Sequence, residues 1–332
     1  MTPAPTGMDG EKADTGSYVS IHTDSLRMDT SPPFALYIRP GADKPHVLYC
    51  ERKTRFTRDA KRRLLQNRID QLYISEKERR LYSRYVADNL ADILGDPKLT
   101  VREKSSILYD SAQAVVEEVL KKPTERTRIE RGKAIVERTV EFMRSEEFLL
   151  EHLLRTISCD YYLYTHSVNV VAYSIALCMR AGYGDPATLR EVANGALLHD
   201  VGESQLDQAT IHKKGALTDE EWQQVKGHPE AGCVLLRKAG NLGEIALDIV
   251  LHHHEKLNGV GYPHSLSGDD ISVFVRIVTI ADIFDALTTE RHHQQARSSF
   301  DALKLMGESM RDELDTDLFR HFVSMMGAGV RR

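Results

Sequence analysis

The sequence predicts a mostly α-helical protein that begins with a small α/β domain. Apolar residues recur at helical spacing from Glu78 almost to the C-terminus. Short β-branched and aromatic runs, separated by turn-forming residues, precede that point between about residues 34 and 76. The composition, with 41% hydrophobic and 28% charged residues, is that of a globular chain rather than a disordered one. Together these observations place an all-helical region after a small mixed one.

The α/β domain is expected over residues 32–90. Residues 1–31, rich in Gly, Pro, Thr and Asp, are expected to form a flexible leader. The runs FALYIRP and HVLYCE predict two strands with the turn PGADKP between them. Thr57 can cap a helix over RDAKRRLLQNR, and DQLYIS predicts a third strand. The domain carries none of the catalytic signatures, so we expect a regulatory or partner-binding role, and it lacks the acidic pocket and phospho-acceptor Asp of a receiver domain.

A basic segment, Glu51 to Arg68, carries eight Lys or Arg residues against two acids. The apolar residues within and next to it recur at helical spacing, which places the bases on the solvated side of a helix. The net charge of −5 also gives no general attraction to nucleic acid. We therefore expect no nucleic-acid binding. The expected buried face consists of Phe56, Ala60, Leu64, Leu65 and Ile69.

The helical region is expected to contain a linker or bundle over residues 91–153, which could mediate homodimerisation, and a catalytic domain over residues 154–332. Breaks fall at Gly95 to Pro97, at Lys122-Pro123 and at Gly182 to Pro186. A long non-helical stretch is expected over residues 202–218. The longest apolar stretch near the middle of the chain, Val168 to Met179, is too short to span a bilayer. Four scattered cysteines fit reduced thiols, so we expect a cytoplasmic protein without membrane insertion.

Five segments of the second half carry His or Asp side chains in apolar surroundings. Singly, each has a structural explanation, because a lone His usually donates to a carbonyl and an Asp after an apolar run usually caps a helix. Burying all of them costs on the order of 1 kcal/mol or more for each unsatisfied group, unless they converge on divalent cations. The side chains are His166, His199, Asp200, His228, His252, His253, His254, Asp282 and Asp285.

Nitrogen and oxygen donors without thiolate favour Fe, Mn, Zn, Co or Ni. The adjacent His199 and Asp200 suit a pair of ions, because a carboxylate can bridge two ions and an imidazole cannot. Two metals about 3.5–4 Å apart can activate a water and hold the phosphoryl oxygens during attack on a phosphodiester. The pattern therefore favours a binuclear hydrolytic centre.

The order of these motifs resembles the HD-GYP family, bacterial HD-superfamily phosphodiesterases that degrade cyclic di-GMP. The resemblance runs from about residue 160 to about residue 322. It includes HSVNV, LLHDVG, GALTDEEWQQVKGHPEAG, HHEKLNGVGYP, SLSGDDI and RIVTIADIFDALTTER in the family's order. It implies an all-helical HD-superfamily catalytic domain that hydrolyses cyclic di-GMP with the help of bound metal.

The resemblance also implies a site, residue by residue. Two divalent ions are expected, Fe or Mn first, with Zn, Ni or Co as alternatives. Glu255 is expected to accept a hydrogen bond from a ligand imidazole. His252 is expected to be structural or to contact a ligand from outside the motif, and Asp285 is expected to be structural. One metal would be held by His166, His199, Asp200 and Asp282, and the other by the bridging Asp200 with His228, His253 and His254. Asp200, Tyr262 and Arg291 are the expected catalytic residues, and further substrate contacts are expected from Gly259, Gly261, Tyr262, Pro263, Arg291 and Lys213.

Three positions depart from the family pattern. Glu203 and Gln294 stand where the family usually has lysines that contact phosphate. A carboxylate near the dianionic substrate opposes its binding by about 1–4 kcal/mol. Tyr162 stands where members with a third metal have a Glu, so we expect two metals and the linear product pGpG.

Three hypotheses follow. The first is a cyclic di-GMP phosphodiesterase of reduced activity. The second is a weak or inactive domain that acts as a cyclic-dinucleotide sensor or as a scaffold for protein partners through the GYP loop or the N-terminal domain. The third keeps the chemistry and changes the substrate to another cyclic dinucleotide or phosphodiester, with Glu203 accepting hydrogen bonds from a base or ribose.

Overall fold

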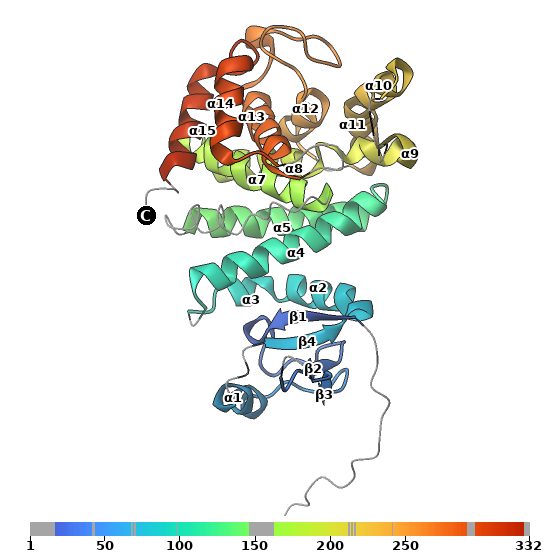
Figure 1. The fold of residues 1–332 in the computed structure, drawn as a ribbon, viewed down its shortest axis with the longest axis vertical. Coiled ribbons are helices and arrows are strands. Elements are labelled where there is room, and N and C mark those ends of the chain that lie inside the picture. The colour runs from blue at the N-terminus through green and yellow to red at the C-terminus, as the bar shows by residue number, and fades with distance from the viewer. Residues whose placement is uncertain are drawn as a thin grey trace, which may run out of the picture. The chain divides into compact units, whose positions relative to one another are not determined.

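The chain divides into two compact units, residues 1–96 and residues 97–332 (Figure 1). The predicted class is confirmed, because helices dominate and strands are confined to a small N-terminal sheet. No helix in the described ranges is both long enough and apolar enough to cross a membrane. The computed structural model describes residues 17–41, 44–67, 69, 71–97, 99–145, 163–211, 213, 215, 217–240, 242–290 and 296–328.

The first unit is built on a four-stranded antiparallel sheet with the strand order β1-β4-β2-β3. One helix precedes the last strand in sequence, and two helices follow it. Leu72 and Ile74 of β4 are fully buried, which places the core of this unit under its central strands. The elements are β1 (Tyr18–His22), β2 (Leu36–Ile38), β3 (Val47–Cys50), α1 (Arg58–Gln66), β4 (Gln71–Ser75), α2 (Arg79–Asp88) and α3 (Leu90–Leu94), with short 3-10 turns η1 (Thr23–Ser25) and η2 (Glu76–Glu78).

The expectation of a flexible leader over residues 1–31 is wrong from Tyr18 onward. Tyr18 to His22 form strand β1, which pairs with β4 from Tyr18↔Ser75 to His22↔Gln71. Ile21 and Leu26 are buried in the core of the unit. The Gly- and Thr-rich composition around this short strand concealed it, and its pairing with a partner about fifty residues later supplies the order. Residues 1–16 lie outside the described residues.

The four predicted elements of the first unit, three strands and one helix, are confirmed as β2, β3, α1 and β4. The hydroxyl of Thr57 caps α1 by accepting a hydrogen bond from the Ala60 amide at 3.2 Å. Phe56 and Leu64 are buried beneath this helix, as expected. Leu65 is not, because 59% of it is exposed. The buried face of α1 is therefore narrower than the sequence suggested.

Helices are the only named elements in the described residues of the second unit. The predicted breaks are confirmed, since α3 of the first unit ends at Leu94, and helices of the second unit end at Lys121 and Arg180. The stretch over residues 202–218 is less irregular than expected, because it contains two short helical turns, η3 and α9. The elements are α4 (Val101–Lys121), α5 (Arg126–Ser145), α7 (Leu163–Arg180), α8 (Pro186–Leu198), η3 (Val201–Gln205), α9 (Gln208–Ile211), α10 (Asp219–Lys226), α11 (His228–Ala239), α12 (Glu244–His252), η4 (Gly268–Asp270), α13 (Val273–Thr288), α14 (Ser299–Ser309) and α15 (Thr316–Ala328).

Helix α7 is the centre of this unit and packs against α8, α13, α4 and α15. Its side chains from Val168 to Cys178 are buried on all sides, as expected of a helix surrounded by others. Helices α4 and α5 pack on α7 and α8 within the same unit (Figure 1). They therefore belong to the helical unit itself, which favours the bundle over the linker, the two alternatives left open for residues 91–153.

Local sequence fixes where the helices that carry the site begin. Asp185 caps α8 by accepting from the Thr188 amide at 3.0 Å, and Pro186 occupies the first helical position. Ser272 caps α13 in the same way, through the Val275 amide. These caps set the register of α8 and α13, and hence the direction in which their later side chains point.

Gly195→Ala is expected to destabilise the helical unit. A Cβ at Gly195 would lie 2.8 Å from the Ile249 Cβ, where α8 and α12 cross. Overpacking at such a site costs about 1–3 kcal/mol, and for a unit of this size each kcal/mol lowers the midpoint of thermal unfolding by about 2–4 °C.

The matched control is Gly184→Ala, because a Cβ there meets no atom within 4 Å. Its midpoint should stay within about 1 °C of the wild-type value. Equal midpoints for the two variants would show that the α8–α12 contact can relax without cost.

Candidate metal centre

The seven predicted metal-binding side chains come together in the helical unit, at the ends or on the inner faces of five helices. Six of them are nearly or fully buried, and only His254 is partly exposed. They come together because α7 packs against α8 and α13, and α12 packs against α8 and α11. His166 lies on α7, His199 and Asp200 directly follow α8, His228 begins α11, His253 and His254 follow α12, and Asp282 lies on α13.

These side chains form two groups. The first, here called the His166 group, contains His166, His199 and Asp282. The second, here called the His228 group, contains Asp200, His228, His253 and His254. In each group the candidate ligand atoms lie within 4.8 Å of one another. Each group could therefore hold one metal ion.

Asp200 faces both groups with different oxygens. Its Oδ2 lies 3.0 Å from Nε2 of His199 and 3.7 Å from Nε2 of His166. Its Oδ1 lies 3.4 Å from Nε2 of His228 and 3.5 Å from Nε2 of His253. This is the placement that a bridging carboxylate requires, with one oxygen directed toward each position.

Hydrogen bonds at Nδ1 fix the tautomers of the buried imidazoles. His199 and His228 donate Nδ1–H to the carbonyls of Ala196 and Val225, both at 2.7 Å, and His253 donates to the Val250 carbonyl at 3.1 Å. A carbonyl can only accept, so in the neutral ring Nε2 is left with a lone pair. These lone pairs point at the carboxylates and at one another, as in the 3.2 Å approach of Nε2 of His228 to Nε2 of His253.

Such an arrangement requires positive charge between the groups. No hydrogen bond of good geometry reaches the buried Nε2 atoms of His166 and His199, although carboxylate oxygens lie 3.2 Å and 3.0 Å away. Lone pairs facing carboxylates at these distances repel unless a cation or a proton separates them. The donor set, imidazole nitrogen with carboxylate oxygen, thus fits divalent transition metals.

The electrostatics of the metal-free centre agree with this conclusion. Burial lowers the pKa of His166, but the two carboxylates beside the ring, those of Asp282 and Asp285, outweigh burial and raise the pKa to about 10. Burial raises the pKa of Asp282, but His166 and its neighbours lower it below the usual range. A proton therefore takes the place of the cation when metal is absent.

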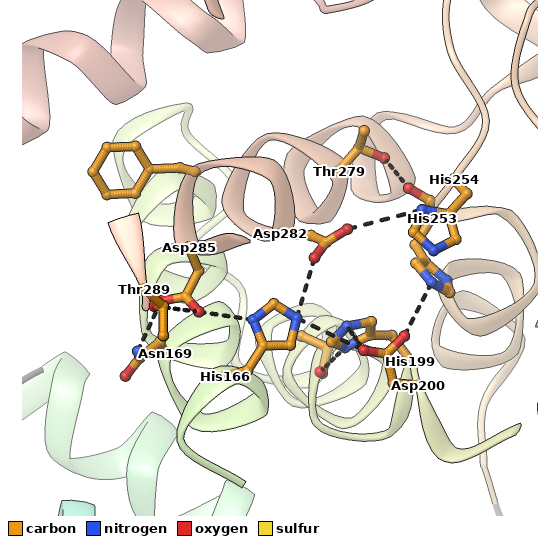
Figure 2. Close-up of polar contacts among 12 residues, drawn as sticks. His166, Asn169, His199, Asp200, His253, His254, Thr279, Asp282, Asp285 and Thr289 are labelled. Atoms are coloured by element: carbon orange, nitrogen blue, oxygen red, sulfur yellow. Dashed lines mark hydrogen bonds and ion pairs between the residues drawn. The ribbon is translucent and has the colours of Figure 1, made fainter. Parts of the chain in front are cut away.

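Asp285 was expected to be structural, but the structure gives it a part in the site. Its Oδ2 accepts Nδ1–H of His166 at 2.7 Å, on the side of the ring opposite Asp282 (Figure 2). Thr289 and Asn169 donate to the same carboxylate at 3.2 Å and 2.7 Å. This carboxylate fixes the tautomer and orientation of His166, as outer carboxylates do for metal-binding histidines.

The backbone at Gly202, two residues after the His199-Asp200 pair, lies too close to α11 for any side chain. A Cβ at this position would lie 1.9 Å from the carbonyl oxygen of His228 and 2.7 Å from the amide nitrogen of Gly232. The turn η3 therefore lies directly against the first turn of α11, and only glycine permits that approach. This contact sets the position of His228 relative to Asp200.

The loop from Asn258 to Gly268 covers His254. The Tyr262 ring lies against the His254 ring, with centroids 4.7 Å apart and an interplanar angle of 33°. Gly261 permits the contact, because a Cβ there would lie 2.5 Å from the Glu255 Cα. Gly259 has a φ of 77°, and the Tyr262-Pro263 peptide bond is cis.

Glu255 has a different role from the one expected. Its side chain is 2% exposed and accepts from the backbone amides of His264 at 2.6 Å and Leu266 at 3.0 Å. It thus anchors the loop over the centre, whereas the sequence suggested a bond to an imidazole. His252, expected to lie outside the centre, hydrogen-bonds Asp248 and belongs to neither group.

The other residues expected to contact substrate differ in their surroundings. Lys213 forms an ion pair with Glu221 at 2.5 Å. Burial first, and the charge of Asp200 second, raise the pKa of Glu203 to about 7, so this carboxyl lies within electrostatic reach of the centre. Arg291, Gln294 and Tyr162 lie outside the described residues.

Lys226 is a candidate contact that the sequence argument missed. Its Nζ lies 5.6 Å from the centroid of the Trp222 ring and 5.8 Å from that of Tyr262, within the range of a cation–π interaction. The two rings meet edge to face at 6.2 Å, and 42% of Trp222 is exposed. An open surface of two aromatic rings and one cation therefore adjoins His254. In the sequence, the i,i+4 spacing of Trp222 and Lys226 was the available indication.

Comparison with known proteins gives consistent matches. The family model of the HD domain matches residues 149–318. A cyclic di-GMP phosphodiesterase of Pseudomonas aeruginosa is 35% identical over 175 residues, which are 53% of this chain and 42% of that protein. The 3′3′-cGAMP-specific phosphodiesterase 3 of Vibrio cholerae is 35% identical over 154 residues, or 46% of this chain and 33% of that protein. The chain thus spans less than half the length of these two relatives.

A solved structure has the same fold over nearly the whole chain. It is an HDGYP protein of Bdellovibrio bacteriovorus, 24% identical, with a TM-score of 0.64. The match covers 94% of this chain and 100% of that one. The likeness concerns the fold, including the N-terminal part that the family model does not match.

Metal loading is expected to release protons, and metal affinity is expected to rise with pH. At neutral pH the metal-free His166 ring carries a proton, because its pKa is raised to about 10. A metal bound at Nε2 must displace that proton, so about one proton should leave as the His166 group is filled. Calorimetric titration of chelator-treated protein with Mn(II), in two buffers of different ionisation enthalpy, measures the release.

His252→Asn is the control, because His252 is also paired with a carboxylate but belongs to neither group. It should release the same number of protons as the wild type. An observed enthalpy that does not depend on the buffer would contradict the protonation assigned to His166.

Proposed function

The chain belongs to the HD domain family, with the motif order of its HD-GYP members, and we propose that it is a metal-dependent phosphodiesterase of cyclic dinucleotides. Cyclic di-GMP is the first candidate substrate and linear pGpG the expected product. The observation that carries the proposal is the sharing of Asp200 between two groups of buried ligand atoms. A single structural ion would not need a carboxylate placed between two such groups.

Two divalent ions are proposed, one in each group, with Fe or Mn as the first candidates. Bound there, they would supply Lewis-acid polarisation of the phosphoryl group and activation of a water. His166, His199 and Asp282 would hold one ion and His228, His253 and His254 the other, with Asp200 between them. The Nδ1–H bonds to carbonyls and to Asp285 hold the rings in place, so little reorganisation is needed when substrate binds.

The rim of the centre supplies groups that suit a nucleotide. Tyr262 and Trp222 present aromatic faces on which a base can stack, worth about 1–3 kcal/mol per base in other proteins. Lys226 places a cation between these rings, next to the centre, where an anionic substrate gains from it. Arg291 is proposed to steady the phosphate, in line with the family motif. Lys226 thus partly offsets the lysines replaced by Glu203 and Gln294.

The identity of the cyclic dinucleotide stays open between two candidates. The matching relatives include one named for cyclic di-GMP and one named as specific for 3′3′-cGAMP, at the same 35% identity. Glu203 favours a substrate with a hydrogen-bond donor near the phosphate, as a base or ribose provides. We therefore propose 3′3′-cGAMP as the second candidate substrate. A sensor without turnover is the remaining alternative.

Turnover by metal-loaded protein tests the proposal. Full-length protein with Mn(II) or Fe(II) is expected to convert cyclic di-GMP into pGpG, as followed by liquid chromatography, and a chelator should stop the reaction. Asp200→Asn should lose more than the about 10–100-fold that outer-shell partners cost, because it removes the bridging charge. Asp248→Asn, the same change on α12 outside both groups, should retain activity.

Three results separate the hypotheses. Faster cleavage of 3′3′-cGAMP than of cyclic di-GMP would change the substrate and keep the chemistry. Nucleotide binding with metal bound but without turnover would favour the sensor. Fewer than two metals per chain in active protein would contradict the binuclear proposal.

Glu203→Lys is expected to tighten binding of cyclic di-GMP at least fivefold. The change removes a carboxylate near Asp200 and restores the cation that the family motif usually has. Two unit charges about 4 Å apart interact by about 1–4 kcal/mol, and a gain of about 1 kcal/mol in binding free energy is the lower end of that range. Fluorescence titration of metal-loaded protein with the nucleotide measures the dissociation constant.

Glu308→Lys makes the same charge change at an exposed position of α14 and should leave the affinity unaltered. An unchanged affinity in Glu203→Lys would remove the electrostatic argument about the rim.

A further inference from the structure

We propose that Tyr109 of α4 is a positioning residue for the metal centre, and that it sets the metal affinity of the His166 group through Asn169 and Asp285. Tyr109 lies forty residues before the region matched by the HD-domain family model, which begins at residue 149. The proposal goes beyond the proposed hydrolysis, because it concerns metal binding and assigns a role to a helix outside that region.

A chain of three short hydrogen bonds carries the proposal. The Tyr109 hydroxyl donates to Oδ1 of Asn169 at 2.7 Å, and Nδ2 of Asn169 donates to Oδ1 of Asp285 at 2.7 Å. Oδ2 of Asp285 then accepts Nδ1–H of His166, also at 2.7 Å. None of the four side chains is more than 4% exposed. Water does not compete for these bonds, so each one orients the next.

Each of these hydrogen bonds can be donated in one direction only, from Tyr109 through Asn169 to Asp285. Asp285 needs donors on its outer side, and the Asn169 amide can supply one only with its nitrogen turned toward the carboxylate. The Tyr109 hydroxyl holds the amide oxygen on the opposite side and so prevents the flip that would place this oxygen against the carboxylate. Figure 2 shows Asn169 and Thr289 on one side of Asp285 and His166 on the other. Loss of the hydroxyl should therefore loosen Asp285, and with it the His166 ring.

The packing beside Tyr109 is not closed. A cavity of about 20 Å³, large enough for about one water, lies next to the ring between α4, α5, α7 and α8. Its walls are apolar and include Leu108, Val136, Val168 and Leu197. The position of Tyr109 therefore depends on its hydrogen bond more than it would in a filled core. Helix α4 is the first helix of the second unit in sequence order. The three hydrogen bonds connect this helix to His166, a candidate metal ligand.

The test measures metal binding by the full chain, without nucleotide. Tyr109→Phe removes one oxygen atom, and titration of chelator-treated protein with Co(II), followed by its visible absorption, resolves the two groups. An outer-shell partner in direct contact with a ligand costs about 10–100-fold in metal affinity. For Tyr109, two bonds further out, a loss of about 3–10-fold in the His166 group is expected, with the His228 group unchanged. Asn169→Leu breaks the same chain at its next link and should lose more.

Two control variants isolate the chain of bonds. Gln113→Leu removes another polar contact between α4 and α7, the 3.3 Å bond to the Thr165 hydroxyl, without touching Asn169. Tyr85→Phe removes a buried, hydrogen-bonded hydroxyl in the first unit. Both should bind metal with wild-type affinity. In the double variant Tyr109→Phe, Asn169→Leu, the loss should not exceed that of Asn169→Leu alone, since both act along one path.

These metal titrations use no nucleotide, so their results do not depend on whether the protein hydrolyses a cyclic dinucleotide. Unchanged metal affinity in folded Tyr109→Phe, or equal weakening of both groups, would overturn the positioning role. If Tyr109→Phe is too unstable to titrate, Asn169→Leu decides alone by the same criterion. Protein that binds two metals but cleaves no cyclic dinucleotide would remove the proposed function and leave this inference standing.

Discussion

The candidate metal centre depends on the hydrogen bonds that buried histidines donate from Nδ1. His199, His228 and His253 donate to carbonyls of their own helices, and His166 donates to Asp285. Each bond decides which nitrogen keeps its lone pair, and all these lone pairs face Asp200 or Asp282. Helix caps, glycine contacts and crossing helices bring the rings together, but the tautomers make the space between them suitable for cations.

The sequence predicted what depends on local pattern. Helical spacing and turn residues located the helices, and the motif order identified the seven side chains that the structure brings together. Asp282 and Asp285 lie three residues apart on one face of α13, so spacing alone could not show that both contact His166, one on each side. The partnership of Tyr109 with Asn169, sixty residues later, depends on how α4 crosses α7. Strand β1 was missed for a similar reason, since its pairing with β4 gives it order.

The centre and its rim are built from different kinds of structure. The candidate ligands lie on or directly after long helices that share one core, or at the first residue of α11. The rim is formed by the turn η3, the short helix α10 and the loop that Glu255 anchors. Side chains on such segments can change without disturbing helix packing. This division explains how Glu203 can stand where the family resemblance implies a lysine while the seven candidate ligands stay in place.

The helical unit extends beyond the residues that the HD-domain family model matches, because α4 and α5 pack on α7 and α8. The matched region begins at residue 149, but Val168, Val171 and Ala172 of α7 are buried on the side that faces α4 and α5. A fragment cut at that boundary would expose this apolar surface to water and leave the Asn169 amide without Tyr109. We therefore expect the matched segment alone to be less stable than the whole helical unit, residues 97–332. Domain excision for biochemical work should begin before α4.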